Sequence, residues 1–483
     1  MSVYDKYQPV IGLEVHAQLL TKTKAFSWEA SEYGAMPNTN ISVVTLAHPG
    51  TLPKANKKAV EFSMKMGLAC GCEITRYNFF DRKNYFYPDL PKGYQITQDK
   101  APICKGGEVR IKLKDGSDKI IKLNRIHMEE DAGKSMHLAE EVDTLVDLNR
   151  AGTPLIEIVS EPDLRDSDEA YAYLTEIKKL VEYLEVCDGN MEEGSLRCDA
   201  NVSVMLKGAT EYGKKVELKN MNSFRNVQRA IEHEIKRQID IIEAGGSIFS
   251  ETRTFDATTG ESKGMRTKED MNDYRYFPEP DLQPVVISDE WLAAVKAEMP
   301  ALPSELFDKF TKQYGLPEYD AFVLTDEKGM ALYFDEICNY TQNYKAASNW
   351  MMGAVKSYLN ELTMDISQFS VKPEQIAELI ALVDSNKVSN SVAKDKIYPE
   401  IIANPSQSAL SVAERLNLIQ QSDAGALQGF VDQVVSKFPE KAAEYKAGKK
   451  GLIGMFMGEV MKLSGGKADP KVTTELLKKK LEE

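Results

Sequence analysis

Three acidic residues stand in a row in the segment RIHMEEDAGKSMH, residues 125–137. Glu129, Glu130 and Asp131 are consecutive, and Lys134 follows after an Ala-Gly step. Adjacent carboxylates repel one another unless a cation or water screens their charge. The segment is therefore either a loop that holds a divalent metal ion or a solvated acidic turn, and its residues leave both open.

A further carboxylate lies in an apolar run, LIEIV at residues 155–159. Burying Glu157 without a partner would be costly. Pairing with an arginine is the plainest structural explanation, and Arg150 is a nearby candidate.

An alternating segment near the N-terminus predicts a β-strand with one buried and one open face. In VIGLEVHAQL, residues 10–19, the odd-numbered positions from Ile11 onward are apolar, whereas the even-numbered positions include Glu14 and His16. Side chains of a strand alternate between its two faces. Glu14 and His16 should therefore lie two residues apart on one face, where both can reach one cation.

Two later segments, 196–206 and 215–220, alternate in the same way. Their apolar residues point inward, and Arg197, Glu217 and Lys219 point outward. A solvated sheet face is the simplest explanation for any one strand. Several such strands whose polar faces carry acidic and basic side chains are more typical of a binding or catalytic surface.

These side chains suggest the kind of metal. Carboxylates with one imidazole suit Mg²⁺, or Mn²⁺, better than zinc. Cys70 and Cys72 are separated by one residue and have no second pair at zinc-finger spacing, so all six cysteines are expected to be small buried residues. The expected metal ligands are Glu14, His16, Glu129, Glu130, Glu157 and Glu217.

Two segments combine tyrosines with basic residues: FDRKNYFYPDLPKGYQ at 80–95 and DYRYFPEPDLQP at 273–284. Their tyrosines could stack on bases or line a polar passage. They could equally be half-buried at sheet edges, and the sequence leaves both open.

Several motifs are absent from the sequence. It contains no G-x-x-x-x-G-K-[ST] phosphate loop, no G-x-G-x-x-G fingerprint, no G-x-S-x-G elbow and no glycine- and serine-rich run with a lysine. The chain thus has parts for metal-dependent phosphoryl chemistry but none for hydrolysing an amide to ammonia. No apolar run approaches the roughly 20 residues of a membrane span, so no membrane partner is expected. Few cysteines and no visible secretory signal favour a cytoplasmic protein.

The length of 483 residues suggests about three domains. Two helices are expected beside the strands: residues 168–186, capped by Ser167, and a helix capped by Ser223 that stops at Gly245-Gly246. From about residue 291 helical periodicity replaces alternation. The expected domains are 1–292, 293–405 and 406–483.

The C-terminal segment differs in charge from the remainder of the chain. Residues 441–483 carry ten lysines and six acids, a net +4, so the total of −14 leaves −18 on residues 1–440. Such a change of sign indicates a separate module. It is either a solvated helical surface or a site for nucleic-acid phosphates. The candidate lysines for RNA are Lys449, Lys450, Lys462 and Lys467.

Seven blocks resemble the signature segments of one family. They are VIGLEVHAQL, FDRKNYFYPDLPKGYQITQ, RIHMEEDAGKS, VDLNRAGTPLIEIVSEPDLR, MEEGSLRCDANVSV, VELKNMNSFRNVQRAIEHE and DYRYFPEPD. Together with the tail GKKGLIGMFMGEVMKLSGGKADP they resemble GatB, the B subunits of aspartyl/glutamyl-tRNA amidotransferases (the GatB/GatE family).

This resemblance implies a fold and an activity. The fold is α+β: a glutamine-synthetase-like antiparallel-sheet cradle, an all-α helical domain and a small helical YqeY-like tail that binds tRNA. The family works as a heterotrimer with an amidase partner, GatA, which releases ammonia from glutamine, and a small third partner, GatC. GatB itself uses ATP and Mg²⁺ to phosphorylate the side-chain carboxylate of Glu on tRNA(Gln) or Asp on tRNA(Asn), and channelled ammonia displaces the phosphate.

The resemblance also implies roles for residues. Lys83 and Glu130 match positions near the mouth of the ammonia channel, and Asp131 is grouped with them as catalytic. The phosphate-binding candidates, chosen by charge and strand face, are Arg150, Lys134, Arg197 and Lys219. Two rival functions remain: a stand-alone carboxylate–ammonia ligase, and a non-catalytic tRNA-docking subunit.

Overall fold

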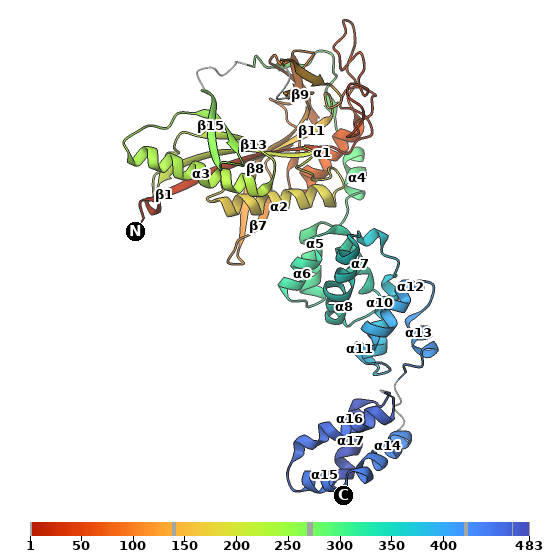
Figure 1. Ribbon diagram of the computed structural model, residues 1–483. Helices are drawn as coiled ribbons and strands as arrows, with labels where there is room; N and C mark the ends of the chain where they lie inside the picture. Colours follow the sequence, from red (N-terminus) through yellow and green to blue (C-terminus); the bar gives the residue numbers. More distant parts are fainter. Residues whose placement is uncertain (1, 138–141, 268–273, 420–423, 466, 483) are drawn as a thin grey trace. The chain divides into compact units, whose positions relative to one another are not determined.

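The computed structural model describes residues 2–137, 142–267, 274–419, 424–465 and 467–482, so Asp273 of the second tyrosine-rich segment lies outside them. The chain forms two compact units, Met1–Pro303 and Ser304–Glu483 (Figure 1). The first combines a large sheet with helices, and the elements of the second are helices, so the fold class is α+β. No helix within the described ranges is long and apolar enough to cross a membrane.

A ten-stranded sheet forms the centre of the first unit. Its order is β15-β14-β13-β12-β1-β11-β8-β6-β2, and β7 pairs with β8. These strands are β1 (Tyr7–Gln18), β2 (Glu73–Ile74), β6 (Cys104–Lys105), β7 (Glu108–Lys112), β8 (Asp118–Glu130), β11 (Pro154–Ser160), β12 (Leu196–Leu206), β13 (Val216–Met221), β14 (Glu251–Asp256) and β15 (Glu261–Thr267).

Smaller sheets flank it. They are β9 (Lys134–His137) with β10 (Thr144–Asp147), β16 (Phe277–Pro278) with β4 (Asp81–Asn84) and β5 (Tyr94–Thr97), and β17 (Val285–Val286) with β3 (Tyr77–Asn78). The pairing of β16 with β4 brings the two tyrosine-rich segments together, Phe277 opposite Arg82.

One pair in the large sheet differs from the predicted antiparallel arrangement. β13 and β14 run parallel, whereas the other pairs are antiparallel. Helix α3 (Phe224–Glu243) lies between them in the chain. A helical crossover returns the chain to the starting end of the sheet, which is the connection that a parallel pair requires.

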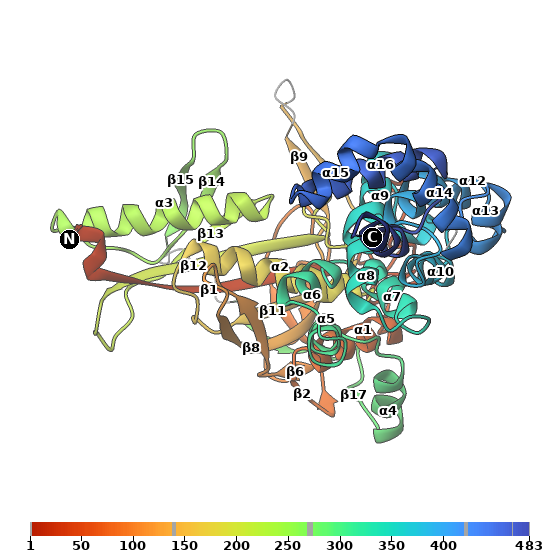
Figure 2. The ribbon, with the colours of Figure 1, turned by 90° about the horizontal axis from the view of Figure 1, so that it is seen from below.

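The two faces of the sheet have opposite character, as the alternation predicts. Helices α2 (Ser167–Tyr183) and α3 cover one face (Figure 2). On β1, Ile11, Leu13 and Val15 are at most 1% exposed and belong to the core that these helices complete. The even-numbered side chains of β1 lie on the opposite, open face.

The helix caps were predicted correctly in one case and one residue too late in the other. Ser223 caps α3 by accepting a hydrogen bond from the Asn226 amide at 3.2 Å. The cap of α2 is Asp166, whose carboxylate accepts from the Glu169 amide at 2.8 Å. Ser167 is already helical, and its hydroxyl donates to Glu232. A carboxylate and a hydroxyl are about equally good caps, so the sequence did not separate them.

Further helices complete the first unit. They are the one-turn helix η1 (Val3–Lys6), α1 (Lys57–Ala69) and α4 (Asp289–Ala297). Trp291 of α4 donates to Glu61 of α1, which ties this helix to the first unit. The first compact unit ends at Pro303, after the predicted boundary at residue 292. The six cysteines are buried free thiols, as expected.

The second unit contains short helices. They are α5 (Pro303–Asp308), η3 (Lys309–Gln313), α6 (Glu318–Leu324), α7 (Lys328–Ile337), α8 (Tyr344–Trp350), η4 (Met351–Val355), α9 (Lys356–Leu362), η5 (Ile366–Gln368), α10 (Pro373–Asp384), α11 (Asn390–Val392), η6 (Ala393–Ile397), α12 (Tyr398–Ala403), α13 (Ala409–Arg415), α14 (Ala424–Lys437), α15 (Pro439–Lys446), η7 (Lys450–Leu452), α16 (Ile453–Leu463) and α17 (Pro470–Glu482). The last helices share a core of their own around Val431, Phe456 and Leu477. The division of this unit at residue 405 stays a prediction.

Candidate functional site

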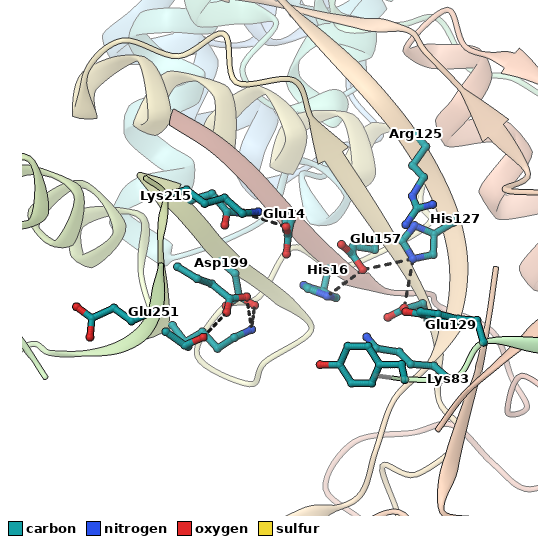
Figure 3. Close-up of a pocket in the computed structure, with 16 residues that line it drawn as sticks. Glu14, His16, Lys83, Arg125, His127, Glu129, Glu157, Asp199, Lys215 and Glu251 are labelled. Carbon is teal, nitrogen blue, oxygen red and sulfur yellow. Dashed lines mark hydrogen bonds and ion pairs between the residues drawn. The ribbon is translucent and has the colours of Figure 1, made fainter. Parts of the chain in front are cut away.

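A pocket of about 340 Å³ lies on the open face of the large sheet (Figure 3). Six carboxylates line it against four lysine and arginine side chains, and two histidines lie among them. This excess of negative charge favours the binding of cations. The charged lining residues are Glu14, Glu129, Glu157, Asp199, Glu217, Glu251, Lys83, Arg125, Lys215 and Lys219, with His16 and His127.

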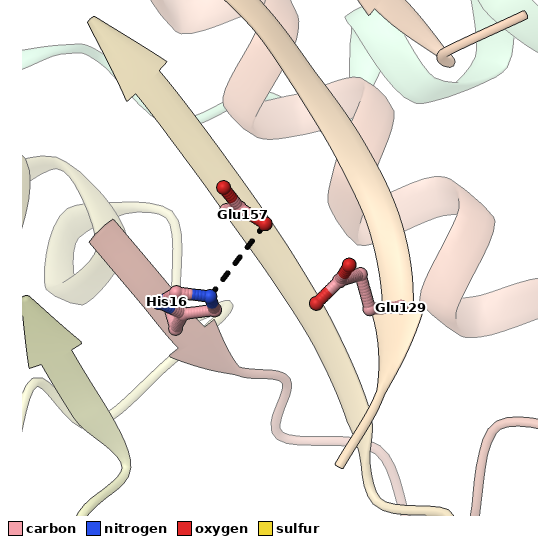
Figure 4. Close-up of side chains that lie close together, drawn as sticks. All are labelled: His16, Glu129 and Glu157. Atoms are coloured by element: carbon pink, nitrogen blue, oxygen red, sulfur yellow. Dashed lines mark ion pairs between the residues drawn. The ribbon is translucent and has the colours of Figure 1, made fainter. Parts of the chain in front are cut away.

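One cluster of ligand-type side chains spans three neighbouring strands. Strand register places His16 of β1 opposite Glu157 of β11, and Glu157 opposite His127 of β8. His16 Nε2 lies 3.6 Å and His127 Nε2 3.3 Å from one oxygen of Glu157. Ligand atoms of His16, Glu129 and Glu157 lie within 4.8 Å of one another (Figure 4). This arrangement could hold one metal ion.

The charges in this first cluster depend on one another. Burial opposes the charged form of His127, but hydrogen bonds to Glu129 and Glu157 raise its pKa to about 9. Burial likewise opposes the charge of Glu129, yet the hydrogen bond from His127 lowers its pKa to about 2. The two histidines hold the pKa of Glu157 well below its usual value against the effect of burial. Both carboxylates are therefore ionised and ready to bind a cation at neutral pH.

A second cluster lies beside the first. Carboxylate oxygens of Glu14, Asp199 and Glu217 lie within 4.8 Å of one another. Glu14 also accepts from the Asn201 amide at 2.9 Å. Burial, followed by the charges of Glu157, Glu217 and Asp199, raises the pKa of Glu14.

Lys219 neutralises part of this second cluster. Its Nζ lies 2.6 Å from Asp199 and 3.1 Å from Glu217. Burial disfavours its charge, but Asp199 and Glu217 raise its pKa overall. A metal ion would compete with Lys219 for the two carboxylates, and a phosphate would compete with the carboxylates for Lys219. Lys219 could therefore exchange its carboxylate partners for a bound phosphate.

The donor set fits a hard divalent cation. Each cluster offers carboxylate oxygens, the first adds an imidazole, and no cysteine takes part among the described residues. Such ligands suit Mg²⁺ or Mn²⁺.

The three consecutive acids separate in space because residues 118–130 form a strand rather than a loop or turn. Glu129 points into the pocket with His127, two residues away on the same face. Glu130 points to the other face, where Lys92 pairs with it and the Ile96 amide donates to it at 2.9 Å. The structure thus does not bring Glu130 to the other predicted metal ligands.

Asp131 is an anchor for two arginines and also accepts from Gln18 at 2.8 Å. Arg197 donates to Asp131 at 2.9 Å, and Arg150 lies 3.8 Å from its other oxygen. Arg150 also donates to the carbonyls of Ala132 and Gly133. The sequence-based pairing of Arg150 with Glu157 was wrong: the partners of Glu157 are the two histidines.

A second pocket, of about 570 Å³, shares His16, Lys83 and Glu129 with the first. Arg197 and Tyr85 line it, whereas Tyr274 lines the first pocket. The Nζ atom of Lys83 lies 5.0 Å from the centre of the Tyr274 ring. Burial disfavours the charge of Lys83, but Glu129 raises its pKa overall. The tyrosine-rich segments thus contribute side chains to the polar pockets.

The other predicted residues lie elsewhere. Lys134 is exposed on β9 and lines neither pocket. Three lysines of the C-terminal segment are exposed and paired: Lys449 with Glu444 at 3.0 Å, Lys450 with Glu482 at 3.2 Å and Lys462 with Glu459 at 3.4 Å. Lys467 is partly buried beside the last helix.

Several residues that line the first pocket were not predicted, Lys215 and Glu251 among them. For four others, Arg125, His127, Asp199 and Asn201, the sequence carries a signal. Arg125 and His127 share the parity of Glu129 on one strand, and Asp199 and Asn201 share the outward face of Arg197. Strand pairing added the missing information, because it places Glu14 opposite Asp199.

Comparisons with known proteins give a consistent result. A family model described as the GatB/GatE catalytic domain matches residues 9–293, and one described as a GatB domain matches residues 332–481. The chain is 50% identical over 476 residues to the B subunit of the aspartyl/glutamyl-tRNA(Asn/Gln) amidotransferase of Trichlorobacter lovleyi, covering 99% of each chain. It is 50% identical over 481 residues to the protein of the same name from Myxococcus xanthus, covering 100% of each.

Proposed function

The chain belongs to the GatB family, the B subunits of aspartyl/glutamyl-tRNA(Asn/Gln) amidotransferases, and we propose that its open sheet face carries the kinase and amidation steps. The substrate is the side-chain carboxylate of Glu on tRNA(Gln) or of Asp on tRNA(Asn), and the products are Gln-tRNA(Gln) and Asn-tRNA(Asn). The cradle would then share the general form of the glutamine synthetase sheet, and the last helices would be the YqeY-like tail.

The observation that carries this proposal is the pair of adjacent acidic clusters on one sheet face. A carboxylate is a poor electrophile until its oxygen becomes a leaving group. ATP supplies the phosphoryl group, and Mg²⁺ screens its charge. The sheet holds the two clusters at a fixed spacing. Bound cations, and the phosphates that they contact, would therefore take fixed positions relative to one another. His16, Glu129 and Glu157 would hold one ion, and Glu14, Asp199 and Glu217 another.

We assign the second pocket to the amino acid at the end of the tRNA. Lys83, held charged beside Glu129, and Arg197, fixed by Asp131, would bind the carboxylate and orient it toward the clusters. Asp131 would act as a positioning residue through Arg197. Glu130, on the opposite face of β8, would hold Lys92 near the ammonia entry rather than bind metal.

The proposed partners and the cytoplasmic location are those that the family implies: a heterotrimer with the amidase GatA and the small protein GatC. The sequence has no amidase nucleophile, which agrees with ammonia supplied by a partner. The lysines Lys449, Lys450, Lys462 and Lys467 are proposed to bind tRNA phosphates.

One experiment separates this proposal from its two rivals. Phosphate release from ATP is measured with free glutamate or with Glu-tRNA(Gln), each with and without the amidase partner. The proposal expects release that requires Glu-tRNA, and amide formation from glutamine that also requires the partner. Release with free glutamate would indicate a stand-alone ligase. No ATP turnover by the complete complex would indicate a docking subunit. The purified chain should hydrolyse no glutamine, and robust hydrolysis would refute the division of labour.

A further inference from the structure

The second acidic cluster is already in contact with a cation that belongs to the chain itself. The Nζ atom of Lys219, on β13, lies 2.6 Å from Asp199 and 3.1 Å from Glu217. Glu14, the third carboxylate, has an oxygen within 4.8 Å of theirs. Asp199 and Glu14 lie on one side of the first pocket, apart from Glu129 (Figure 3). The ammonium group of Lys219 therefore contacts the oxygens that a metal ion in this cluster would need.

A β-bulge directs this lysine toward the cluster. The register between β12 and β13 shifts beside Asp199, where two residues of β13, Lys219 and Asn220, stand opposite it. Asn220 has a left-handed backbone, with φ of 65°, and donates to the Thr254 hydroxyl of β14 at 2.8 Å. Bulges turn side chains away from the regular alternation, and they are frequent beside active sites. Because of this bulge, Lys219 and Asn220 both lie on the open face.

Lys219 also faces the second pocket. It lines the first and the second pocket, as Asp199 does. A lysine carries its charge as a compact point at the end of a flexible four-carbon stem. Its side chain is 31% exposed, which leaves the stem room to rotate. Such a rotation would move the charge from the carboxylates into the second pocket, where Lys83 and Arg197 already lie.

A metal ion and this lysine cannot share the second cluster. Both are positive, and both need the oxygens of Asp199 and Glu217. In the first cluster the neighbours of Glu157 are imidazoles, which can bind a metal ion through a ring nitrogen. An ammonium group has no lone pair to offer, so it must leave. The two clusters therefore differ in what has to happen before a metal ion binds.

We propose that Lys219 is an internal counter-ion that fills the second cluster until a metal ion displaces it, and that its ammonium group then binds the substrate carboxylate in the second pocket. The inference rests on the proposed function, which makes the clusters metal sites and the second pocket the carboxylate site. Without a carboxylate to receive it, the ammonium group returns to the cluster and competes with the metal ion. Metal binding and carboxylate binding should therefore strengthen each other by the same factor.

The test measures Mn²⁺ binding to the full chain by electron paramagnetic resonance in the presence of two small probes. Glutamate α-methyl ester has the free side-chain carboxylate of an esterified glutamate, and glutamine α-methyl ester lacks it. The wild type should bind one Mn²⁺ ion well and a second ion weakly. The glutamate ester should tighten the weaker site by about fivefold or more, the lower end of typical coupling between sites. The glutamine ester should leave it unchanged.

Two variants remove the charge of Lys219. Lys219→Met should tighten the weaker Mn²⁺ site by about tenfold or more without any ester, because a competing positive charge is lost. It should also abolish the effect of the glutamate ester. Lys219→Gln should give the same two results, and circular dichroism checks that each variant folds.

Lys215→Met is the matched control. Lys215 lines the first pocket, is exposed and has no ion pair among the described residues. This variant therefore loses the same charge from the same pocket, but it should keep the effect of the glutamate ester on Mn²⁺ binding.

The outcomes separate the inference from the proposed function. If the wild type binds two Mn²⁺ ions equally well without an ester, if the glutamate ester changes nothing, or if Lys219→Met loses the weaker site, the inference fails alone. If Lys215→Met tightens the site and abolishes the coupling as Lys219→Met does, net charge is responsible, which also overturns the inference. If no Mn²⁺ binds under any condition, the clusters are not metal sites and the proposed function fails as well.

Discussion

The open face of the sheet and the C-terminal helices both concentrate charge, but they fix it in different ways. His127 and Glu129 are 3% and 4% exposed, and strand register sets their spacing. Side chains of Lys449 and Lys462 are 71% and 80% exposed and pair with acids close by in the chain. Buried groups lose solvent and depend on each other, whereas exposed pairs contribute little individually.

Under the proposed function, this difference implies two kinds of contribution to one reaction. A buried cluster acts as a unit, so the loss of one member should affect catalysis sharply. A surface of exposed lysines acts through its summed charge, so its effect should be graded and sensitive to salt.

The largest expected effect is at the sheet. His16→Ala should reduce phosphorylation of Glu-tRNA by roughly 10- to 100-fold at limiting Mg²⁺, because the loss of a residue that holds or orients a metal site typically costs that much in metal affinity or activity. The fold should persist, since the apolar face of β1 is untouched. The measurement is transamidation at limiting Mg²⁺, with circular dichroism as a check of folding.

Gln8→Ala is the matched control, because Gln8 shares the strand and face of His16 but lies outside the clusters. It should leave transamidation unchanged. Near wild-type activity of His16→Ala at limiting Mg²⁺ would show that the metal assignment is wrong.

A smaller, graded effect is expected at the tail. If three or four lysines contact phosphates, log K for tRNA should fall with log salt at a slope of about −2 to −3. Between 50 and 200 mM salt this is roughly a 15- to 60-fold loss of affinity. Replacing Lys449, Lys450, Lys462 and Lys467 with Gln, or deleting the chain after residue 405, should flatten the slope and raise KM for Glu-tRNA.

The same four positions changed to Arg keep the charge and should restore the slope. The slope is measured from tRNA binding across a salt series. As a control, the affinity for tripolyphosphate should not change in any of these variants. If the Gln variant has the same slope as the wild type, these lysines do not bind tRNA, and the tail is a solvated helical surface.

The smallest effect compares a buried lysine with an exposed one. Lys24 is fully buried, and burial lowers its pKa from 10.5 to about 8 despite the charge of Glu29. Because folding lowers the pKa of Lys24, the free energy of unfolding should rise with pH between about 8 and 10.5. Below pH 8 the folded protein carries the full cost of burying the charged lysine. Lys24→Met should therefore stabilise the protein at pH 7 by on the order of 1 kcal/mol and remove that rise.

Urea unfolding at several pH values measures this effect. Lys462→Met is the control, since its side chain is 80% exposed and the change should be nearly neutral. If both variants show the same pH dependence of stability as the wild type, folding does not lower the pKa of Lys24, and the prediction is wrong.

Local pattern was sufficient for several features. Alternation placed Glu14 and His16 together on the open face of β1, and the structure has them there because a strand's side-chain period does not depend on its neighbours. Composition showed the sign change at the tail. The motif blocks identified the family, since seven long segments in order do not arise by chance.

Only the tertiary structure decided how separate strands combine. The three consecutive acids were interpreted as a metal-binding loop or an acidic turn, whereas residues 118–130 form a strand that places Glu129 and Glu130 on opposite faces. The sequence could not pair Glu157 with His16 and His127, or Glu14 with Asp199, because register between distant strands depends on the packing of the whole sheet. The sequence identified candidate ligands on individual strands. Their division into two clusters arises from the pairing of five strands.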